Sequence, residues 1–490
     1  MSNKKRQKLY FKKQKGKEII ADFSGGLITS NAGIILIAEL DRKLKITEKF
    51  SKCFQDYRHL SYTDYTMREL LAQRIYALIL GYEDLNDHEK LRYDPTLMLA
   101  LSKLNFIEKE PKGLAGKSTL NRLEYCPKDI INPKESRYHK IEVLPEEIEK
   151  AFGEIFLESY SKPPKSIIID LDVTDDEVHG NQEGAFFNKY YHSVCYAPLY
   201  IFCGRHLLAA KLRSSNVDPA AGAKEELERI ITQIREKWPN TQILVRADSA
   251  YAREEIFALC EGIKDVNYVI AIATNNQLKK RASDVAEKAQ KDYEERAELV
   301  SKFFDDLGFN KQELDTVREI IPDAKWYGSL CYKTETSWSR TRRVVTKVEY
   351  GSEGIKTRHV VTSLPSSKIS PSQLYTKKYC PRGEMENRIK EQQLDLFADR
   401  TSTQTFDGNQ LRLWLSSMAY VLVQAFRENC LKKTSLQKAT VGTIRLSLFK
   451  LGARIIVSVR RILIAIASSC PYQELLVLIN SRIQAIPNTE

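Results

Sequence analysis

Hydrophobic and polar residues alternate at helical spacing over the first part of the chain. Apolar residues recur at intervals of three and four over 32–44 and 66–80, and a shorter segment of this kind covers 116–126. This spacing places apolar side chains on one face of a helix. Residues 1–20 instead form a run of charges with little periodicity, so we expect a disordered arm there.

The pattern changes after Pro163 and Pro164 to short apolar runs rich in β-branched residues. These runs predict strands, which lie at 165–173, twice within 190–213 around a tight turn at 203–205, at 242–247 and at 267–273. Helical segments at 218–238 and 252–260 separate the later strands. The order predicts an α/β layer that begins with a hairpin and continues with β-α-β units.

A β-rich block and a helical region complete the chain. A charged helical stretch at 277–320 precedes three strand-like runs within 326–364, with a turn at 351–354. Beyond residue 371, apolar stripes at helical spacing cover 411–426 and 444–466, so we expect helices there.

Composition narrows the class of protein. The 490 residues correspond to about three domains. No window approaches the roughly 18 uncharged apolar residues of a membrane span, and no apolar segment follows the basic N-terminus as in a secretory signal. The nine cysteines are never spaced C-x-x-C, which disfavours a disulfide framework or structural zinc and indicates a reducing compartment.

Positive charge is concentrated at the two ends of the chain. The net charge is +12, of which residues 1–20 carry +7 and residues 400–490 carry +8, so the middle is slightly acidic. Two basic ends favour a polyanionic partner, most commonly nucleic acid. A solvated tail and a charged surface helix would explain the same distribution.

Acidic residues end two of the predicted strands. Asp170 and Asp172 lie two apart in IDLDVTDD, and therefore on one face of a strand, while Asp248 follows QILVRA. Carboxylates at strand ends in one sheet could hold Mg²⁺ or Mn²⁺, which prefer oxygen ligands. Acids also terminate strands for purely structural reasons, and Asp248 before Ser249 could cap a helix.

A third acidic segment, YCPRGEMENRIKEQQ, lies at 379–393. Glu386 is four residues after Arg382 and four before Lys390, so these residues could simply form ion pairs along an exposed helix. In the β-rich block, Trp338 lies in the polar stretch TETSWSRTRR. If its ring is exposed it could stack on a displaced base, although packing within a hairpin is an equally simple explanation.

Three motifs together resemble those of DDE-type insertion-sequence transposases. Asp172-Val173-Thr174 is similar to the Asp-x-Thr of that family, and Arg246-Ala247-Asp248-Ser249 resembles its second acidic motif. Tyr379, Arg382 and Glu386 follow the Tyr-x2-Arg-x3-Glu signature, but Gln393 stands where the signature has Lys, and Lys390 lies one turn earlier. Segments 81–87 and 180–191 also look like family segments. The resemblance covers roughly residues 20–480.

The resemblance implies a fold and a mechanism. It implies a ribonuclease-H-like mixed sheet core with a β-rich insertion, flanked by mainly helical N- and C-terminal regions. Asp172, Asp248 and Glu386 would be both catalytic residues and ligands of two Mg²⁺ or Mn²⁺ ions, with Asp170 as the alternative to Asp172. Tyr379, Arg382 and Lys390 would contact DNA, with Trp338 as a further DNA-binding residue.

The implied function is DNA transposition: binding of transposon ends, metal-dependent cleavage and strand transfer. The partners would be double-stranded DNA, both terminal inverted repeats and target DNA, and a second subunit in a homodimer, without any membrane. The setting would be bacterial cytoplasm, in association with the nucleoid. A ribonuclease-H-like DNA nuclease without strand transfer, or a non-catalytic transposase-derived DNA-binding protein, are the alternatives.

The 138 residues between Asp248 and Glu386 exceed a single crossover and require an inserted subdomain. We therefore expect six parts, in chain order: a basic disordered arm at 1–20, a helical DNA-binding region at 21–155, the first part of the catalytic core at 160–275, a β-containing insertion subdomain at 276–374, the second part of the core at 375–430 and a C-terminal helical region at 431–490.

Overall fold

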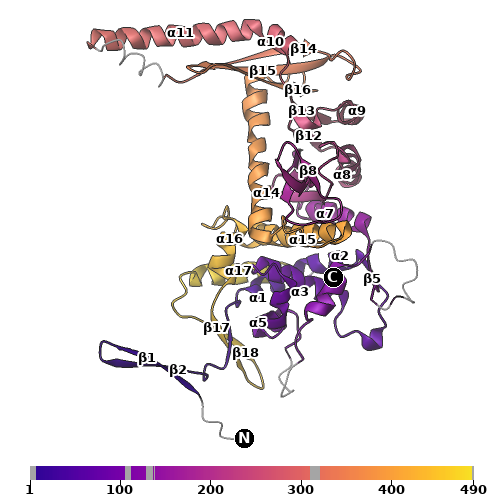
Figure 1. Ribbon diagram of the computed structural model, residues 1–490, viewed down its shortest axis with the longest axis vertical. Helices are drawn as coiled ribbons and strands as arrows, with labels where there is room; N and C mark the ends of the chain where they lie inside the picture. The colour runs from indigo at the N-terminus through magenta and orange to yellow at the C-terminus, as the bar shows by residue number, and fades with distance from the viewer. Residues whose placement is uncertain (1–6, 105–111, 128–135, 137, 309–320, 488–490) are drawn as a thin grey trace. The chain divides into compact units, whose positions relative to one another are not determined.

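The computed structural model describes residues 7–104, 112–127, 136, 138–308 and 321–487. They divide into two units, each described by itself below: unit 1 comprises Met1–Ala151 and Lys390–Glu490, and unit 2 comprises Phe152–Ile389 (Figure 1). Parts of four predictions lie outside the described residues: the start of the basic arm, two stretches of the N-terminal helical region, the end of the charged helical stretch and the last three residues of the C-terminal region.

An eight-stranded mixed sheet organises unit 2. In sheet order its strands are β11 (His206–Lys211), β10 (Leu199–Cys203), β6 (Ser166–Val173), β12 (Gln242–Ala247), β13 (Val266–Ile272), β16 (Gly354–Thr362), β15 (Arg342–Gly351) and β14 (Ala324–Tyr332). The β6, β12 and β13 strands are parallel, and the other neighbours are antiparallel. The predicted α/β layer and β-rich block are confirmed, and the strands of that block extend the same sheet.

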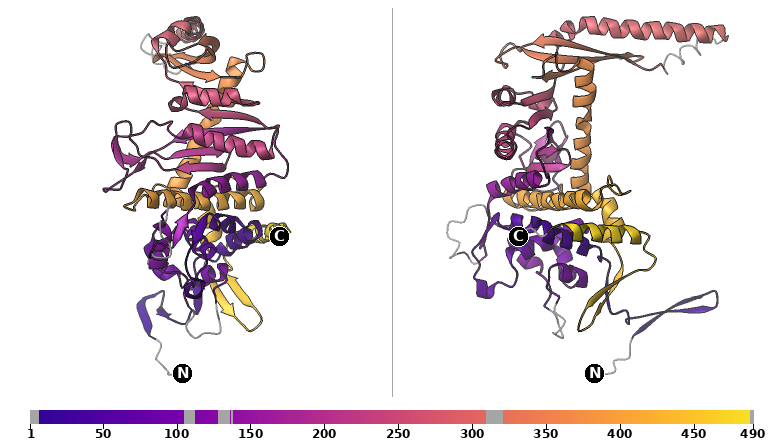
Figure 2. Two further views of the ribbon diagram at one scale, coloured as in Figure 1. Left: turned by 90° about the vertical axis from the view of Figure 1, so that its right-hand side faces the viewer. Right: turned by 180° about the vertical axis from the view of Figure 1, so that it is seen from behind.

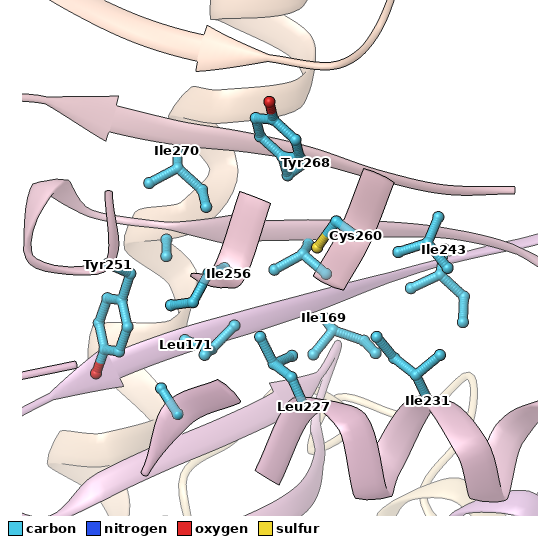
Figure 3. Close-up of a cluster of buried hydrophobic side chains, with 14 of the residues drawn as sticks. Ile169, Leu171, Leu227, Ile231, Ile243, Tyr251, Ile256, Cys260, Tyr268 and Ile270 are labelled. Carbon is cyan, nitrogen blue, oxygen red and sulfur yellow. The ribbon is translucent and has the colours of Figure 1, made fainter. Parts of the chain in front are cut away.

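Alternation along the strands separates two cores in unit 2. Ile243 and Val245 of β12 pack on one face against α8 (Ala223–Lys237) and α9 (Glu254–Gly262), as Figure 3 shows for part of this cluster. Leu244, between them, points to the other face and packs in a cluster with Leu374 and Tyr375. Figure 2 shows α8 and α9 along the same face of the sheet. Period-two burial of this kind is what a strand covered on both faces requires.

A small sheet and two helices also belong to unit 2. A small sheet in the order β7 (Asp176–Glu177), β9 (Ser193–Tyr196) and β8 (Phe186–Asn188) follows β6 directly. The charged helical stretch forms α10 (Asn276–Arg281) and α11 (Ser283–Asp306), and α11 packs against β14 and β15 through a cluster that includes Tyr293 and Ala324.

Helices form most of unit 1. The longer ones are α1 (Ile34–Leu44), α3 (Met67–Ile79), α6 (Lys117–Glu124), α15 (Phe406–Cys430) and α17 (Gln473–Ala485). The predictions at 32–44, 66–80, 116–126 and 411–426 are therefore confirmed. Thr66 begins α3 with a capping box: its side chain accepts from the Glu69 amide, and the Glu69 carboxylate accepts from the Thr66 amide.

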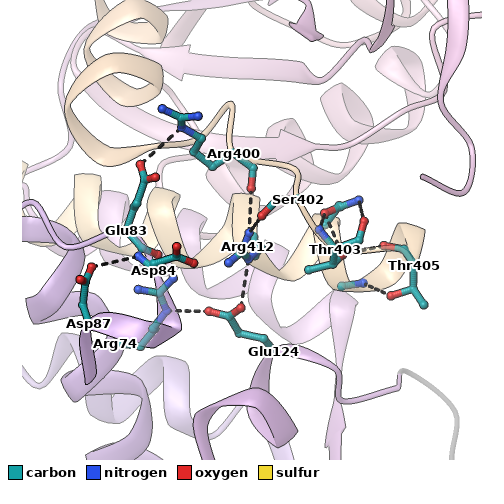
Figure 4. A network of polar contacts seen from close by, with 12 residues as sticks. Arg74, Glu83, Asp84, Asp87, Glu124, Arg400, Ser402, Thr403, Thr405 and Arg412 are labelled. Carbon is teal, nitrogen blue, oxygen red and sulfur yellow. Dashed lines mark hydrogen bonds and ion pairs between the residues drawn. The ribbon is translucent and has the colours of Figure 1, made fainter. Parts of the chain in front are cut away.

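A buried ion network fastens three of these segments together in unit 1. Arg74 of α3 donates to Oε1 of Glu124 at 2.6 Å, and Arg412 of α15 donates to Oε2 of the same carboxylate at 3.0 Å (Figure 4). The Glu124 side chain is almost fully buried, and its two arginines lower its pKa against the opposing effect of burial. Two arginines on one carboxylate leave neither oxygen unpaired, which is the condition under which a buried charge is tolerated.

The predicted helix over 444–466 is wrong beyond residue 449. The chain there forms α16 (Val441–Ile444), a π-helical turn η6 (Arg445–Phe449), and strands β17 (Ala453–Val457) and β18 (Ile462–Ile466). The β17 strand pairs with β3 (Leu27–Thr29), more than 400 residues earlier in the sequence. Alternate burial of Ala453 and Ile455 follows a strand period. β-branched residues fit both a helical stripe and a strand, and pairing of β17 with both β18 and β3 selects the strand.

The predicted disorder of the basic arm is also wrong where the arm is described. Residues Lys8–Gln14 (β1) and Lys17–Asp22 (β2) form an antiparallel hairpin that is exposed along its whole length. Lys15 and Gly16 both have positive φ, 48° and 78°, as the two central residues of a type I′ turn require. The Lys-Gly pair was the sequence signal for this turn.

The remaining described elements are short, apart from α7 and α14. They are α2 (Ile46–Ser51), β4 (Phe54–Asp56), η1 (Leu60–Tyr62), η2 (Leu85–Asp87), α4 (His88–Leu91), α5 (Pro95–Ala100), β5 (Ile141–Val143), α7 (Pro145–Glu158), η3 (Ser249–Tyr251), α13 (Pro371–Gln373), η4 (Leu374–Tyr379), η5 (Cys380–Arg382) and α14 (Gly383–Leu396). None of the described helices is long and apolar enough to cross a membrane.

Candidate active site

Two of the predicted carboxylates end neighbouring parallel strands. Arg246 of β12 is the register partner of Asp170 of β6. Because both strands run in the same direction, two further residues along each bring Asp172 and Asp248 to the same edge of the sheet. The same alternation places all four side chains on the face of Leu244, against which η4 packs.

The Asp170 carboxylate is occupied by Arg246. The guanidinium donates from Nε to Oδ1 at 2.5 Å and from Nη2 to Oδ2 at 2.7 Å, and both side chains are nearly fully buried. Burial raises the pKa of Asp170, and Arg246 acts in the opposite direction. The partner of Asp170 is therefore an arginine rather than another acid.

Arg246 also reaches the segment that carries the third acid. Its Nη1 donates to the carbonyl of Lys378 at 2.7 Å, and its Nη2 lies 3.4 Å from the carbonyl of Pro381. These carbonyls belong to the π-helical turn η4 and the 3-10 turn η5, which lead into α14. One buried guanidinium therefore connects both central strands to the backbone just before Arg382.

Arg382 bridges the first and third predicted carboxylates. Its Nη1 donates to Oδ2 of Asp172 at 3.0 Å, and its Nη2 donates to Oε1 of Glu386 at 3.3 Å. The Asp172 side chain is largely buried, whereas that of Glu386 is 53% exposed. Tyr379 lies beside them, half-buried against Tyr375, and burial raises its pKa while Arg382 lowers it.

The acids interact electrostatically around Asp172. The pKa of Asp172 is raised to about 6: burial and the charges of Asp248 and Glu386 raise it, and together they outweigh the opposing effect of Arg382. Like charges that disfavour one another's ionisation mark a place where a cation would be stabilised. Asp248 in addition accepts from the Ala250 amide at 2.9 Å and so caps η3, which makes the capping explanation correct without excluding a second role.

Mg²⁺ and Mn²⁺ are hard divalent cations that prefer oxygen ligands, and the carboxylates of Asp172, Asp248 and Glu386 offer such oxygens. Within the part of the chain that the structure describes, no three acidic, His or Cys side chains are already gathered as a metal-binding group. The positive charge between Asp172 and Glu386 is that of Arg382. A metal there would take over the role of this guanidinium, so Arg382 must release at least one carboxylate.

Trp338 does not have the exposure that its predicted role requires. Its ring is only 6% exposed and lies edge-on against Phe257 and Tyr332, with the Arg342 guanidinium over its face at 5.5 Å. The prediction of an exposed base-stacking tryptophan is therefore wrong, and the packing explanation is correct. The polar residues around Trp338 hid this, because the ring packs on α9 and β14 rather than on its own neighbours.

Lys390 and Gln393 follow Glu386 on α14, and Lys390 is exposed. Sequence reasoning missed the Asp170–Arg246 pair as a functional feature. The sequence contains a signal for this pair. Asp170 lies two residues before Asp172, Arg246 lies two residues before Asp248, and the charges of Asp170 and Arg246 are of opposite sign.

Almost the whole chain matches the model of a known protein family. A family model described as "Transposase DDE domain group 1" matches residues 11–488. One similar solved structure is a piggyBac transposase synaptic complex with hairpin DNA, determined by cryo-EM. It is 9% identical, with 93% of this chain and 86% of that chain covered and a TM-score of 0.38. No curated protein matches the chain significantly.

Proposed function

Because the chain belongs to the group 1 DDE transposase domain family, we propose that it is an insertion-sequence transposase, which binds transposon ends and catalyses metal-dependent DNA cleavage and strand transfer. The observation that carries this proposal is the meeting of Asp172, at the end of β6, with Glu386 of α14 through Arg382, beside the strand end that bears Asp248. The run of antiparallel β11, β10 and β6 followed by parallel β12 and β13 supports a ribonuclease-H-like core.

In this proposal Asp172, Asp248 and Glu386 hold two Mg²⁺ or Mn²⁺ ions. The pair of metals, when bound, would activate the attacking oxygen and stabilise the leaving oxygen at a phosphodiester. Asp172 is the preferred first ligand because Arg246 occupies both oxygens of Asp170. Asp172 must be ionised to act as a ligand, and its neighbours Asp248 and Glu386 oppose that ionisation until a cation is present.

The remaining residues would bind and orient DNA. Arg382 is placed to exchange a carboxylate for a backbone phosphate, because a guanidinium matches both groups with the same paired donors. Lys390 lies exposed one turn beyond Glu386 and would contact the next phosphate, with Tyr379 packed beside Arg382. We further propose double-stranded transposon-end and target DNA as partners and a homodimer on paired ends; the six-part division of the chain stays a prediction.

Two alternatives differ in outcome. A nuclease without strand transfer would use the same carboxylates but would not join DNA ends, and inverted repeats would not flank its coding sequence. A non-catalytic DNA-binding descendant would not need an intact acidic set, whereas this chain retains Asp172, Asp248 and Glu386. That retention favours an enzyme.

The test is to separate binding from chemistry. Asp248→Asn removes a metal ligand and no phosphate contact, so end binding should stay near wild type while cleavage with Mg²⁺ is abolished. Asp306→Asn, at the exposed end of α11, is the matched control and should cleave normally. A transposon-end substrate and a supercoiled target in one reaction report cleavage and joining separately. Normal cleavage by Asp248→Asn would refute the catalytic assignment.

A further inference from the structure

Trp338 is too buried to stack on a base, but unit 2 has other aromatic side chains that are exposed. Phe186, Phe187 and Tyr190 are 45%, 60% and 83% exposed, and Val194, opposite Phe187, is also exposed. They lie on the aromatic hairpin, defined here as residues 186–196: strand β8, the turn at 189–192 and strand β9. Large rings normally bury most of their surface, so three exposed rings within five residues require an explanation.

The aromatic hairpin is rigidly held. Oδ1 of Asn188 accepts from the amides of Tyr190 and Tyr191 at 2.9 and 3.3 Å, which closes the turn. The other end of the Asn188 side chain donates to the carbonyl of Ser215, and the Ser215 hydroxyl donates to the carbonyl of Phe186 at 2.7 Å. His192 completes the turn with a φ of 57°. The rings are therefore presented from a fixed backbone, at little ordering cost on binding.

The hairpin is also continuous with the candidate active site. Its inner strand β9 pairs with β7, which begins four residues after Asp172. Tyr191 lies close enough to Asp172 and Asp175 to feel both charges, and its ring packs edge-on against that of Tyr190 at 5.0 Å. Tyr190 is therefore linked, through its contact with Tyr191, to the surroundings of Asp172, a carboxylate that the proposed reaction uses.

We propose that the aromatic hairpin binds unpaired nucleotides at a DNA end by stacking bases on Phe187 and Tyr190. The inference rests on the proposed function for the identity of the polymer. Aromatic rings stack on any base because every base has a π-face, with about 1–3 kcal/mol per base. Lys189, exposed in the same turn, supplies the positive charge that a phosphate beside a stacked base requires.

The chemistry favours nucleotides over an apolar protein surface. A protein partner would be matched by one continuous apolar face, whereas here Lys189 and His192 flank the rings of Tyr190 and Tyr191 in the turn. A DNA end that is cut beside these carboxylates would have its last bases within reach of the hairpin, because β7, the neighbour of β9, begins four residues after Asp172. A second copy of this chain on the same rings is the competing occupant and is an outcome of the test below.

The experiment measures metal-free binding of full-length protein to three DNAs: a blunt duplex, the same duplex with a short single-stranded overhang, and that overhang with abasic residues. Phe187→Ala and Tyr190→Ala should each weaken overhang binding at least tenfold, about 1.4 kcal/mol, and leave blunt and abasic DNA unaffected. Phe187→Trp should retain wild-type affinity. Phe303→Ala is the control because its ring, on α11, is 61% exposed, as that of Phe187 is.

Each other result overturns the inference. Equal loss on all three DNAs would mean a duplex contact or a structural role, and melting temperatures of the variants separate these. Unchanged DNA binding with lost self-association would assign the rings to a subunit interface. Because the binding assay contains no metal, its outcome does not depend on cleavage. Normal cleavage by Asp248→Asn would refute the proposed function alone, and a loss of binding specific to unpaired bases would stand without it.

Discussion

Arg246 and Asp170 are register partners on adjacent parallel strands, and the Arg246 guanidinium donates to both carboxylate oxygens of Asp170, at 2.5 and 2.7 Å. The same guanidinium donates to the Lys378 carbonyl. The pair therefore joins the two acid-bearing strands to the turn that presents Arg382 and Glu386. The Arg246 side chain thus connects the edge of the sheet that bears Asp172 and Asp248 to the start of α14, which lies far away in the sequence.

Breaking this pair should destabilise the protein and misplace the third carboxylate. Arg246→Met leaves Asp170 buried without its partner, which costs about 3–5 kcal/mol. The double substitution Asp170→Leu with Arg246→Met removes both charges and should restore most of the stability, but not cleavage, because the Lys378 carbonyl still lacks its donor. Urea unfolding and single-turnover cleavage measure the two effects. Wild-type cleavage by the stable double variant would show that Arg246 has no positioning role.

Lys390 should contribute to DNA binding although it is not at the signature position. Glu386 is paired with Arg382, so Lys390 is not required as the partner of Glu386. We expect Lys390→Ala to reduce end binding or cleavage at least tenfold, about 1.4 kcal/mol, and Gln393→Lys to be tolerated or to strengthen binding slightly. Lys291→Ala, in an exposed i,i+4 pair with Glu295 on α11, is the control. Wild-type binding and cleavage by Lys390→Ala would eliminate the phosphate contact.

Removing residues 1–20 should weaken DNA binding irrespective of sequence. The exposed β1–β2 hairpin carries Lys8, Lys12 and Lys13 on one strand and Lys17 on the other. The slope of log K against log salt is negative, and each lost phosphate contact makes it less steep by about 0.9. Binding to specific and random duplexes between low and moderate salt measures this slope. An unchanged slope would show that the hairpin does not contact phosphate.

Acid should weaken unit 2 through the carboxylates around Arg342. Hydrogen bonds from Arg342 and Ser339, with the charge of Arg342, lower the pKa of Glu254 to about 2, from an ordinary 4.5. A pKa lower in the folded state stabilises the fold above the unfolded value, so this contribution is present above about pH 4.5 and is lost as the pH falls towards 2. Glu254→Gln should therefore flatten the dependence of unfolding free energy on pH in that range. Urea unfolding of both proteins at several pH values measures this dependence. If the unfolding free energy of Glu254→Gln changed with pH as steeply as that of the wild type, Glu254 would not be the source of the effect.

The sequence by itself determined the elements whose hydrophobic period is unambiguous. The strands at 165–173, 242–247 and 267–273, the helices at 66–80 and 411–426, and the acids that end two strands all followed from local patterns. Order along the chain was enough to place Asp172 and Asp248 at one sheet edge, because parallel neighbours end on the same side.

Only tertiary structure decided the rest, because the deciding partners are distant in sequence. Residues 453–457 pair with β3, more than 400 residues earlier, as well as with the neighbouring strand β18, and Trp338 is buried against Phe257, 81 residues earlier. Asp170 and Arg246, 76 residues apart, neutralise one another in the interior, and Arg382 lies between Asp172 and Glu386. A local pattern reports the period of burial, whereas the identity of each buried contact is set by chain segments that no local window contains.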